Sequence, residues 1–163
     1  MVIIRKAKIS DALKIKKIID FYARREIMLF RPIYAIYSNI RDYFVAQINK
    51  KIVGCCALHV SGKEYKPGRR EAVLAEVKSL AILEKYQGER IGTRLVRKCI
   101  REAKKMEINK IFTLTIKENL DFFKRMGFKE IKKTELPQKI WQECADCPRF
   151  PSECNEIPLI LKI

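Results

Sequence analysis

The sequence lacks any apolar run close to the about 20 residues that a membrane-spanning helix needs. Glycine and proline are few, six of each, and there is no internal repeat, low-complexity tract or Ser/Gly-rich linker. The first ten residues carry a basic pair after only four residues and no small-residue cleavage site, which predicts a first strand rather than a secretion signal. We therefore expect a cytoplasmic protein with no membrane partner.

Acidic residues are also scarce, because 19 Asp and Glu stand against 35 Lys and Arg, for a net charge of +16. Such a field attracts polyanions, whether nucleic acid, an acidic membrane or a phosphorylated cofactor. No nucleic-acid-binding motif accompanies the basic residues, so solvation and ion pairing on helix surfaces is the plainer interpretation. The length of 163 residues, with 48% hydrophobic and 33% charged residues, predicts one globular domain over residues 1–163.

Apolar spacing predicts an α+β domain. Ser10 and Asp11 are typical of a helix start, and an apolar face of that helix follows at Ile15, Ile18, Ile19 and Tyr22. Pro32 is placed to begin a second helix, which ends near Arg41. We further expect helices over 88–106 and 118–126, strands over 2–6, 42–48, 51–60, 72–83, 111–116 and 159–163, a strand after Phe128, and a loop over 61–70. A two-residue hairpin turn is expected at Asn49 and Lys50.

The junction between the strand over 72–83 and the following helix carries the strongest chemical signal. Gly88 and Gly92 flank a loop that leads into the helix, where free N–H groups and the positive end of the helix dipole can hold an anion. Lys85, Arg90 and Arg94 would add positive charge there. On the residues alone, an ordinary tight turn stays open as the alternative.

The segment Gln87-Gly88-Glu89-Arg90-Ile91-Gly92 is similar to the pyrophosphate loop Arg/Gln-x-x-Gly-x-Gly/Ala of the GNAT acetyltransferase superfamily, except that Arg90 stands where the middle glycine lies. The resemblance extends over essentially the whole chain. It implies a central, mixed, mostly antiparallel sheet flanked by helices, with acetyl-CoA as cosubstrate. The cofactor contacts it implies are Leu80, Ala81, Ile82, Gln87, Gly88, Glu89, Arg90, Ile91, Gly92, Thr93 and Phe123.

Four further segments resemble the short, stand-alone N-acetylglutamate synthases: 28–32, 39–45, 75–81 and 136–141. This resemblance implies acetylation of the α-amine of glutamate or glutamine, the first step of arginine biosynthesis. Two alternatives stay open: a GNAT enzyme that acetylates a protein N-terminus or another small amine, and a basic nucleic-acid-binding module. The expected partner is a small amino acid, with a second copy of the chain left open.

Acetyl transfer to an amine needs a base that removes a proton from the ammonium group. Glu76 is the candidate, because it lies in an apolar strand where burial would raise its pKa towards neutrality; a cross-strand ion pair is the alternative. Lys78 leaves the same face of the strand about 6–7 Å away and could meet a substrate carboxylate. Arg31 offers a second, bidentate carboxylate partner, and a solvated residue before Pro32 is its alternative.

The resemblance also implies how the thioester is handled. A backbone N–H near Leu80, after a bulge in the strand, would stabilise the developing oxyanion, and the edge Leu80–Ile82 would pair with the pantetheine amides. Many GNAT enzymes have a tyrosine at the position of Phe123, which protonates the leaving thiolate. Phe123 has no proton to give, so water or a hydroxyl such as that of Thr115 would replace it, or the thiolate leaves without a proton. A plain strand residue is the preferred interpretation of Thr115.

The segment 136–158 is rich in proline and cysteine. Cys144, Cys147 and Cys154 form a compact three-thiol group, but tetrahedral zinc requires a fourth ligand. Asp146, Cys55, Cys56 and His59 could supply it only if the fold brings one near. Reduced structural thiols are the preferred interpretation, and zinc or a disulfide between two of the cysteines stays an alternative.

Overall fold

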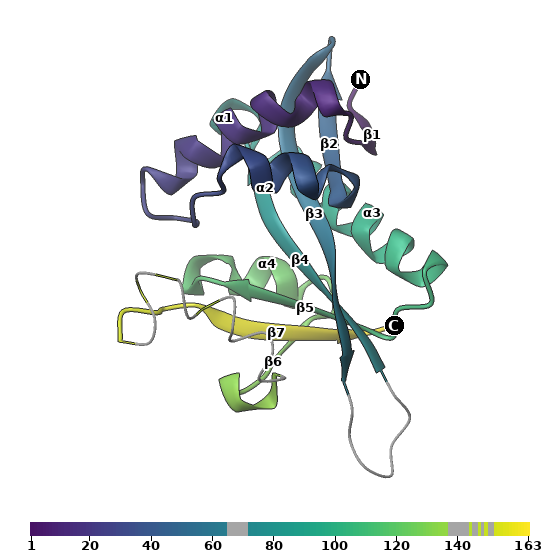
Figure 1. Ribbon diagram of the computed structural model, residues 1–163, viewed down its shortest axis with the longest axis vertical. Helices are drawn as coiled ribbons and strands as arrows, with labels where there is room; N and C mark the ends of the chain where they lie inside the picture. The colour runs from purple at the N-terminus through teal and green to yellow at the C-terminus, as the bar shows by residue number, and fades with distance from the viewer. Residues whose placement is uncertain (65–71, 137–143, 145–146, 148, 150–151) are drawn as a thin grey trace. The chain divides into compact units, whose positions relative to one another are not determined.

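The structure is a computed structural model that describes residues 1–64, 72–136, 144, 147, 149 and 152–163 (Figure 1). The chain forms two compact units, one made of Met1–His59 with Val77–Met106 and the other of Val60–Glu76 with Glu107–Ile163. The helices are α1 (Ala12–Ala23), α2 (Ile33–Ser38), α3 (Ile91–Lys105) and α4 (Leu120–Lys124). The strands are β1 (Ile3–Lys6), β2 (Tyr43–Ile48), β3 (Lys51–Glu64), β4 (Ala72–Ile82), β5 (Lys110–Thr115), β6 (Lys129–Glu130) and β7 (Ile157–Lys162). No helix among the described residues has the length and apolar character to span a bilayer.

The seven strands are hydrogen-bonded in the order β1-β2-β3-β4-β5-β7-β6. The pairs β1/β2, β2/β3, β5/β7 and β6/β7 are antiparallel, whereas β4/β5 is parallel. This arrangement confirms the predicted mixed, mostly antiparallel sheet flanked by helices in an α+β fold.

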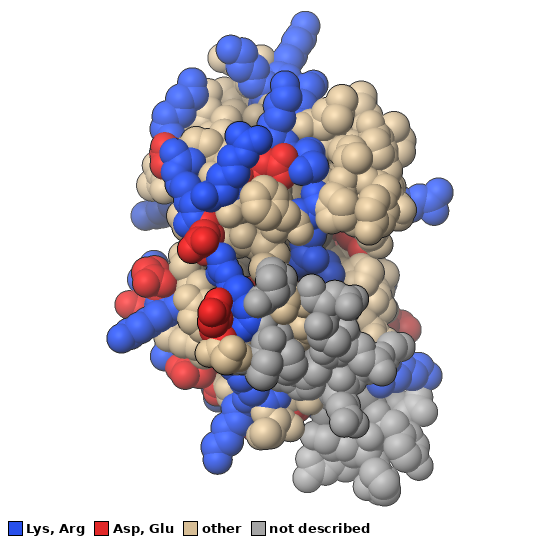
Figure 2. All heavy atoms as spheres, turned by 60° about the vertical axis from the view of Figure 1, so that its left-hand side comes forward, with Lys and Arg blue, Asp and Glu red and all other residues tan. Residues whose placement is uncertain are grey.

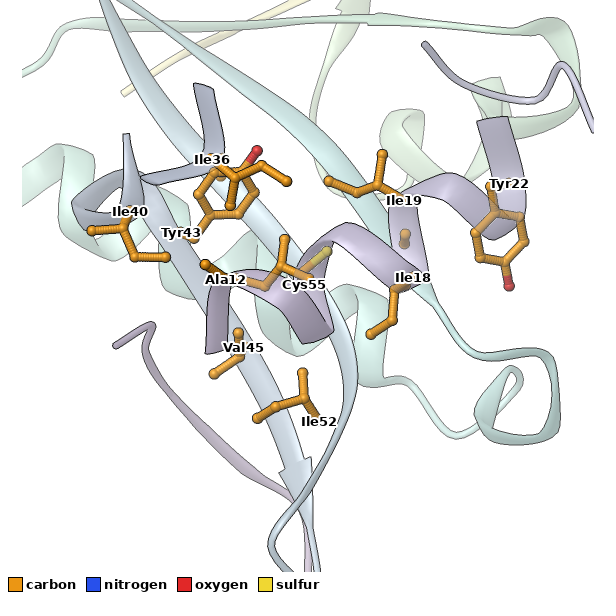
Figure 3. Packing of buried hydrophobic residues seen from close by; sticks show 13 residues of the cluster. Ala12, Ile18, Ile19, Tyr22, Ile36, Ile40, Tyr43, Val45, Ile52 and Cys55 are labelled. Atoms are coloured by element: carbon orange, nitrogen blue, oxygen red, sulfur yellow. The ribbon is translucent and has the colours of Figure 1, made fainter. Parts of the chain in front are cut away.

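In the first unit, the predicted apolar face of α1 packs on the sheet. Ile15, Ile18, Ile19 and Tyr22 are buried, and they join side chains from β2 and β3 in one hydrophobic cluster (Figure 3). Fully burying an aliphatic side chain of this size contributes about 1.5–3 kcal/mol. The cluster therefore holds α1 against the strands through side chains spaced three and four residues apart.

The start of α1 differs from the prediction. Ser10 does not cap it; a 3₁₀ turn over Ile9–Asp11 precedes the helix. The buried Asp11 carboxylate accepts hydrogen bonds from the Lys8 N–H at 2.9 Å and from the Arg5 guanidinium at 2.7 and 3.2 Å. Burial acts to raise the pKa of Asp11, but these hydrogen bonds outweigh it, and the pKa lies below its usual value of 3.8.

The β2–β3 hairpin confirms the turn expected at Asn49 and Lys50. Both residues have positive φ angles, 45° and 64°, as a two-residue type I′ turn requires. Strand β3 runs on to Glu64, so the prediction of a loop from Ser61 was wrong for the first four residues. The polar and glycine-containing sequence is compatible with a strand here because tertiary pairing overrides weak local propensity.

Strand β4 is regular near its start and irregular near its end. Its parallel register with β5 covers Leu74–Glu76. Three residues later, Ser79 has a φ of 54°, which interrupts the extended backbone. Gly54 of β3 lies so close to the end of β4 that an added Cβ would be 3.0 Å from the Ala81 carbonyl oxygen. A side chain there would push the two strands apart.

The second unit has its own apolar packing. Leu74, Phe112 and Leu136 form a buried cluster, and Phe123 of α4 packs edge-on against Phe128 with ring centroids 5.4 Å apart. Strand β7 begins at Ile157, two residues before the predicted start, because Ile157 and Pro158 pair with Thr115 and Leu114 of β5. Pro158 needs only to accept in this ladder, so its missing N–H is tolerated.

The Asp11 interaction makes a pH-dependent stability prediction. Because its pKa is lowered on folding, the carboxylate stabilises the fold above the ordinary pKa and loses this contribution as the pH falls through the folded-state pKa. We expect Asp11→Asn to lower the free energy of unfolding by about 1–3 kcal/mol at pH 7, and the difference from the wild type to shrink between pH 5 and pH 2. Urea denaturation at several pH values measures it.

Asp20→Asn is the matched control, because Asp20 pairs with Lys16 along the surface of the same helix at 2.5 Å. It should cost about 0.5 kcal/mol or less. A loss at Asp11 that is no larger than at Asp20, or that does not change with pH, would contradict the prediction.

Candidate active site

The loop between β4 and α3 contains two residues with positive φ angles just before the helix begins. A 3₁₀ turn over Glu84–Tyr86 leads into Gln87, and α3 begins only at Ile91, three residues later than predicted. Positive φ angles of 81° at Gly88 and 58° at Arg90 explain the delay, because helical residues need negative φ. Arg90 thus adopts the left-handed backbone that a glycine would adopt freely, at a cost of about 1–2 kcal/mol.

The first turn of α3 leaves backbone donors available. The first backbone hydrogen bond at this end runs from Arg94 N to Arg90 O at 3.1 Å. In the part of the chain that the structure describes, the N–H groups of Ile91, Gly92 and Thr93 therefore have no intrahelical acceptor. An added Cβ on Gly88 would meet no atom within 4 Å, so the loop is open beside these donors. A diphosphate fits this chemistry.

The Gln87 side chain holds the loop in place. Its amide donates to the Tyr22 hydroxyl at 2.8 Å and to the Ile82 carbonyl at 3.2 Å, and the Tyr22 hydroxyl donates to the same carbonyl. Burial raises the pKa of Tyr22, although the hydrogen bond from Gln87 opposes the rise, so the phenol stays protonated at neutral pH. Gln87 therefore connects the loop to α1 and to the end of β4.

The three basic side chains near the loop differ in their surroundings. Lys85 lies over the Tyr86 ring, 4.7 Å from its centroid. Arg94 donates to the Val2 carbonyl at 2.8 Å, which makes it part of the packing against the N-terminal segment rather than a cationic group free for an anion. Arg90 is exposed at the N-cap of α3. Of the three predicted charges, Arg90 has the position best suited to a bound phosphate.

The predicted catalytic and substrate residues come from two elements. Glu76 and Lys78 lie two residues apart on β4; Glu76 is buried and Lys78 is partly exposed. Arg31, partly exposed, lies in the segment before α2. The left-handed Ser79 follows Lys78 directly and precedes the expected oxyanion donor near Leu80. The break in the strand is thus where the pattern predicted it, and the roles of these residues stay predictions.

A family model described as an acetyltransferase (GNAT) domain matches residues 39–130. An uncharacterised N-acetyltransferase of Chlorobaculum tepidum is 40% identical over 96% of this chain and 94% of its own. The chain belongs to the GNAT acetyltransferase family. It is therefore an N-acetyltransferase that uses acetyl-CoA.

Two further comparisons concern this acetyltransferase. An amino-acid acetyltransferase of Mycobacterium tuberculosis is 29% identical over 86% of the chain and 76% of its own length. The crystal structure of an N-acetylglutamate synthase from Neisseria gonorrhoeae, complexed with coenzyme A and N-acetyl-glutamate, has a TM-score of 0.82 and 23% identity over 99% of this chain and 35% of that one. At this identity the structural likeness shows the fold.

Phe123 of the acetyltransferase lies on α4 in the second unit. It is buried and packs edge-on against Phe122 and Phe128. This packing explains why an apolar ring suits the position. The predicted contact of Phe123 with the cofactor stays a prediction. Thr115, at the end of β5, is also buried and belongs to the same unit.

The cysteines are all free thiols. Cys144 and Cys147 are joined by a backbone hydrogen bond of 2.9 Å, and the Lys133 ammonium lies 3.6 Å from the Cys154 sulfur. Burial, followed by Glu156 and the neighbouring thiols, raises the pKa of Cys144. No metal-binding group of three ligands occurs among the described residues, and Asp146 lies outside them. His59 pairs with Asp42 at 2.6 Å.

The basic residues do not form one patch on the face shown in Figure 2, where Lys and Arg side chains are scattered and interleaved with acidic ones. Several have partners, including Lys6 with Glu102 at 3.2 Å and Lys124 with Glu130 at 3.1 Å. This distribution favours the interpretation of a charged surface with ion pairs.

Sequence reasoning missed three polar groups at this site. Tyr22 was assigned to the apolar face of α1, yet its hydroxyl fixes the loop. Tyr43 and Ser79 were part of strand patterns and carried no signal of their own. Their importance depends on burial and on neighbours distant in the sequence, which the order of residues does not reveal.

The strained backbone at Arg90 can be tested by substitution. We expect Arg90→Gly to raise the free energy of unfolding by about 0.5–1 kcal/mol, because glycine removes the left-handed penalty although it is more flexible when unfolded. Coenzyme A affinity should stay within about threefold if backbone donors carry the binding, since only one charge is lost. Urea denaturation and calorimetry measure the two quantities.

Arg97→Gly, the same change at an exposed position inside α3, should lower stability by about 1 kcal/mol. Destabilisation by both substitutions would show that Arg90 is not strained. A loss of coenzyme A affinity above tenfold in Arg90→Gly would assign the binding to its side chain instead.

Proposed function

We propose that this acetyltransferase transfers the acetyl group of acetyl-CoA to the α-amine of L-glutamate or glutamine, the first step of arginine biosynthesis. The observation that carries the proposal is the combination of a buried Glu76 with two cationic side chains, Lys78 and Arg31, in a GNAT chain. The relative named amino-acid acetyltransferase supports it. A polyamine acceptor is disfavoured because two cations would repel it.

Each part of the site has a defined task in this proposal. The N–H groups of Ile91, Gly92 and Thr93 hold the cofactor diphosphate, and Gln87 keeps their loop in position. The β4 segment Leu80–Ile82, which follows the end of the register with β5, pairs with the pantetheine amides. When bound, acetyl-CoA supplies an activated thioester, and a backbone N–H near Leu80 polarises its carbonyl.

The acceptor amine reacts only when it is neutral. Glu76 removes the proton from the ammonium group, directly or through water, and thereby frees the nitrogen lone pair for attack. Lys78 and Arg31 bind substrate carboxylates and orient the amine. Because Phe123 has no hydroxyl, the proton for the departing thiolate comes from water or from another hydroxyl group.

A substrate panel tests the proposal. The full chain is incubated with acetyl-CoA and, separately, glutamate, glutamine, leucine, spermidine and a short peptide, and acetylated products are quantified by mass spectrometry. We expect kcat/KM for glutamate or glutamine to exceed that for leucine or spermidine by at least about 100-fold, as loss of a charged recognition contact implies. Preferential acetylation of the peptide, or no acetylation of glutamate and glutamine, overturns the proposal.

The role of Glu76 gives a second prediction. Glu76→Gln should lower kcat by about 100-fold or more, because general-base catalysis is removed while the side chain keeps its size. The calorimetric affinity for coenzyme A should change less than about twofold, since the proposed cofactor contacts lie elsewhere.

Glu102→Gln on α3 is the matched control, because Glu102 pairs with Lys6 and has no proposed part in catalysis. It should leave kcat within about twofold, as for a surface ion pair. An equal kcat in wild type and Glu76→Gln would remove Glu76 from the mechanism.

A further inference from the structure

Ser79 has an unusual environment for a serine in a strand. It is 8% exposed, and its backbone is left-handed with a φ of 54°. Among the residues that the structure describes, its Oγ is the buried side-chain polar atom for which no hydrogen-bond partner exists. An unpaired buried hydroxyl destabilises a fold, and such groups are uncommon without a functional reason.

Tyr43 presents a second buried hydroxyl beside it. The residue begins β2 and is 4% exposed, and its ring belongs to the hydrophobic cluster that includes Ile36 and Ile40 (Figure 3). Burial raises the pKa of Tyr43, so the phenol keeps its proton at neutral pH and can donate it in a hydrogen bond. The Cys55 thiol donates to the Ser79 carbonyl oxygen at 3.5 Å, and Cys55 belongs to the same cluster as Tyr43, which brings Ser79 close to the phenol. The Ser79 side chain acts to lower the pKa of Tyr43, although no hydrogen bond of good geometry joins the two hydroxyl groups.

Two charged residues lie close to Tyr43. Arg31 stands between Met28 and Ile33, which both pack against the cluster that contains Tyr43, and Asp42 directly precedes Tyr43 in the chain. The Arg31 guanidinium acts to lower the pKa of Tyr43 and the Asp42 carboxylate acts to raise it. Asp42 is already paired with the His59 ring at 2.6 Å. Arg31 is therefore the cationic group of this cluster, and all of these residues belong to the first unit.

We propose that Tyr43 and Ser79, together with Arg31, form the subsite that binds a carboxylate group of the amino-acid acceptor. A carboxylate has about four acceptor positions, and this cluster offers two neutral hydroxyl donors and a guanidinium fork. Binding gives the Ser79 hydroxyl the acceptor that it lacks. The inference deepens the proposed function and rests on it for the identity of the ligand.

Removal of the Ser79 hydroxyl should weaken substrate binding and at the same time stabilise the ligand-free protein. Ser79→Ala should raise KM for glutamate about tenfold, because a hydrogen bond to a charged group is lost. In the ligand-free protein the same change should raise the melting temperature by about 2–4 °C, because an unpaired polar group leaves the interior. A merely structural role for Ser79 would not produce this combination.

Tyr43→Phe should also raise KM for glutamate about tenfold, with kcat and KM for acetyl-CoA within about twofold. Two controls match these changes. Tyr34→Phe removes an exposed hydroxyl on α2, and Ser38→Ala removes a hydroxyl that donates to the Tyr34 carbonyl at 2.9 Å. Both should leave KM unchanged, and Ser38→Ala should lower the melting temperature.

Comparison of glutamate, glutamine and the α-amide of glutamate identifies the bound group. If the subsite holds the α-carboxylate, Tyr43→Phe will impair glutamate and glutamine alike, with no further effect on the α-amide. If it holds the side-chain carboxylate, the variant will impair glutamate and the α-amide but not glutamine. Equal KM values in the wild type and both variants for all three substrates overturn the inference.

A binding measurement separates this inference from the proposed function. Glutarate, a dicarboxylate without an amine, should raise the melting temperature of the wild type but not that of the Tyr43→Phe/Ser79→Ala double variant. If the wild type acetylates no amino acid yet shows this difference, the proposed function fails and the subsite stands. If glutamate is acetylated but glutarate stabilises wild type and double variant equally, the subsite is refuted and the function stands.

Discussion

The carbonyl group of Ile82, at the end of β4, is the point on which the geometry of the proposed cofactor loop, Gln87–Gly92, depends. It accepts hydrogen bonds from the Tyr22 hydroxyl and from the Gln87 amide, and Gln87 also donates to Tyr22. These contacts join α1, β4 and the loop before α3 within one unit. The free N–H groups of α3 are consequently presented from a fixed position, which lowers the entropic cost of binding an anion.

Strand β4 combines a structural and a chemical role because it is regular in one part and interrupted in another. Up to Glu76 it pairs in parallel with β5, and at Ser79 its backbone turns left-handed. Strain of this kind, like the strain at Arg90, persists only where the surrounding structure stabilises it, and it is common at functional sites. The acetyltransferase carries strained backbone both at its cofactor loop and beside its proposed acceptor site.

The position of the loop before α3 could be predicted, because its signal is local. The Gln87–Gly92 spacing located the loop, and the apolar pattern over 72–83 located the strand that carries Glu76 and Lys78, whose roles stay predictions. The start of α3 at Ile91 was not predicted, since it depends on the dihedral angles of Gly88 and Arg90 rather than on apolar spacing. Arg94 was expected to face the loop, yet it bonds to Val2, which is distant in the sequence.

The sequence by itself determined the α+β class, the face of α1 that is buried, and the hairpin turn at Asn49 and Lys50. These features follow from side-chain periodicity and backbone sterics, which act over a few neighbouring residues. Only the tertiary structure decided that the Tyr22 hydroxyl supports the loop and that the hydroxyls of Tyr43 and Ser79 are both buried in the same unit. Those relations arise when strands and helices far apart in the chain are brought together, and burial then sets which hydroxyls lack partners and which keep their protons.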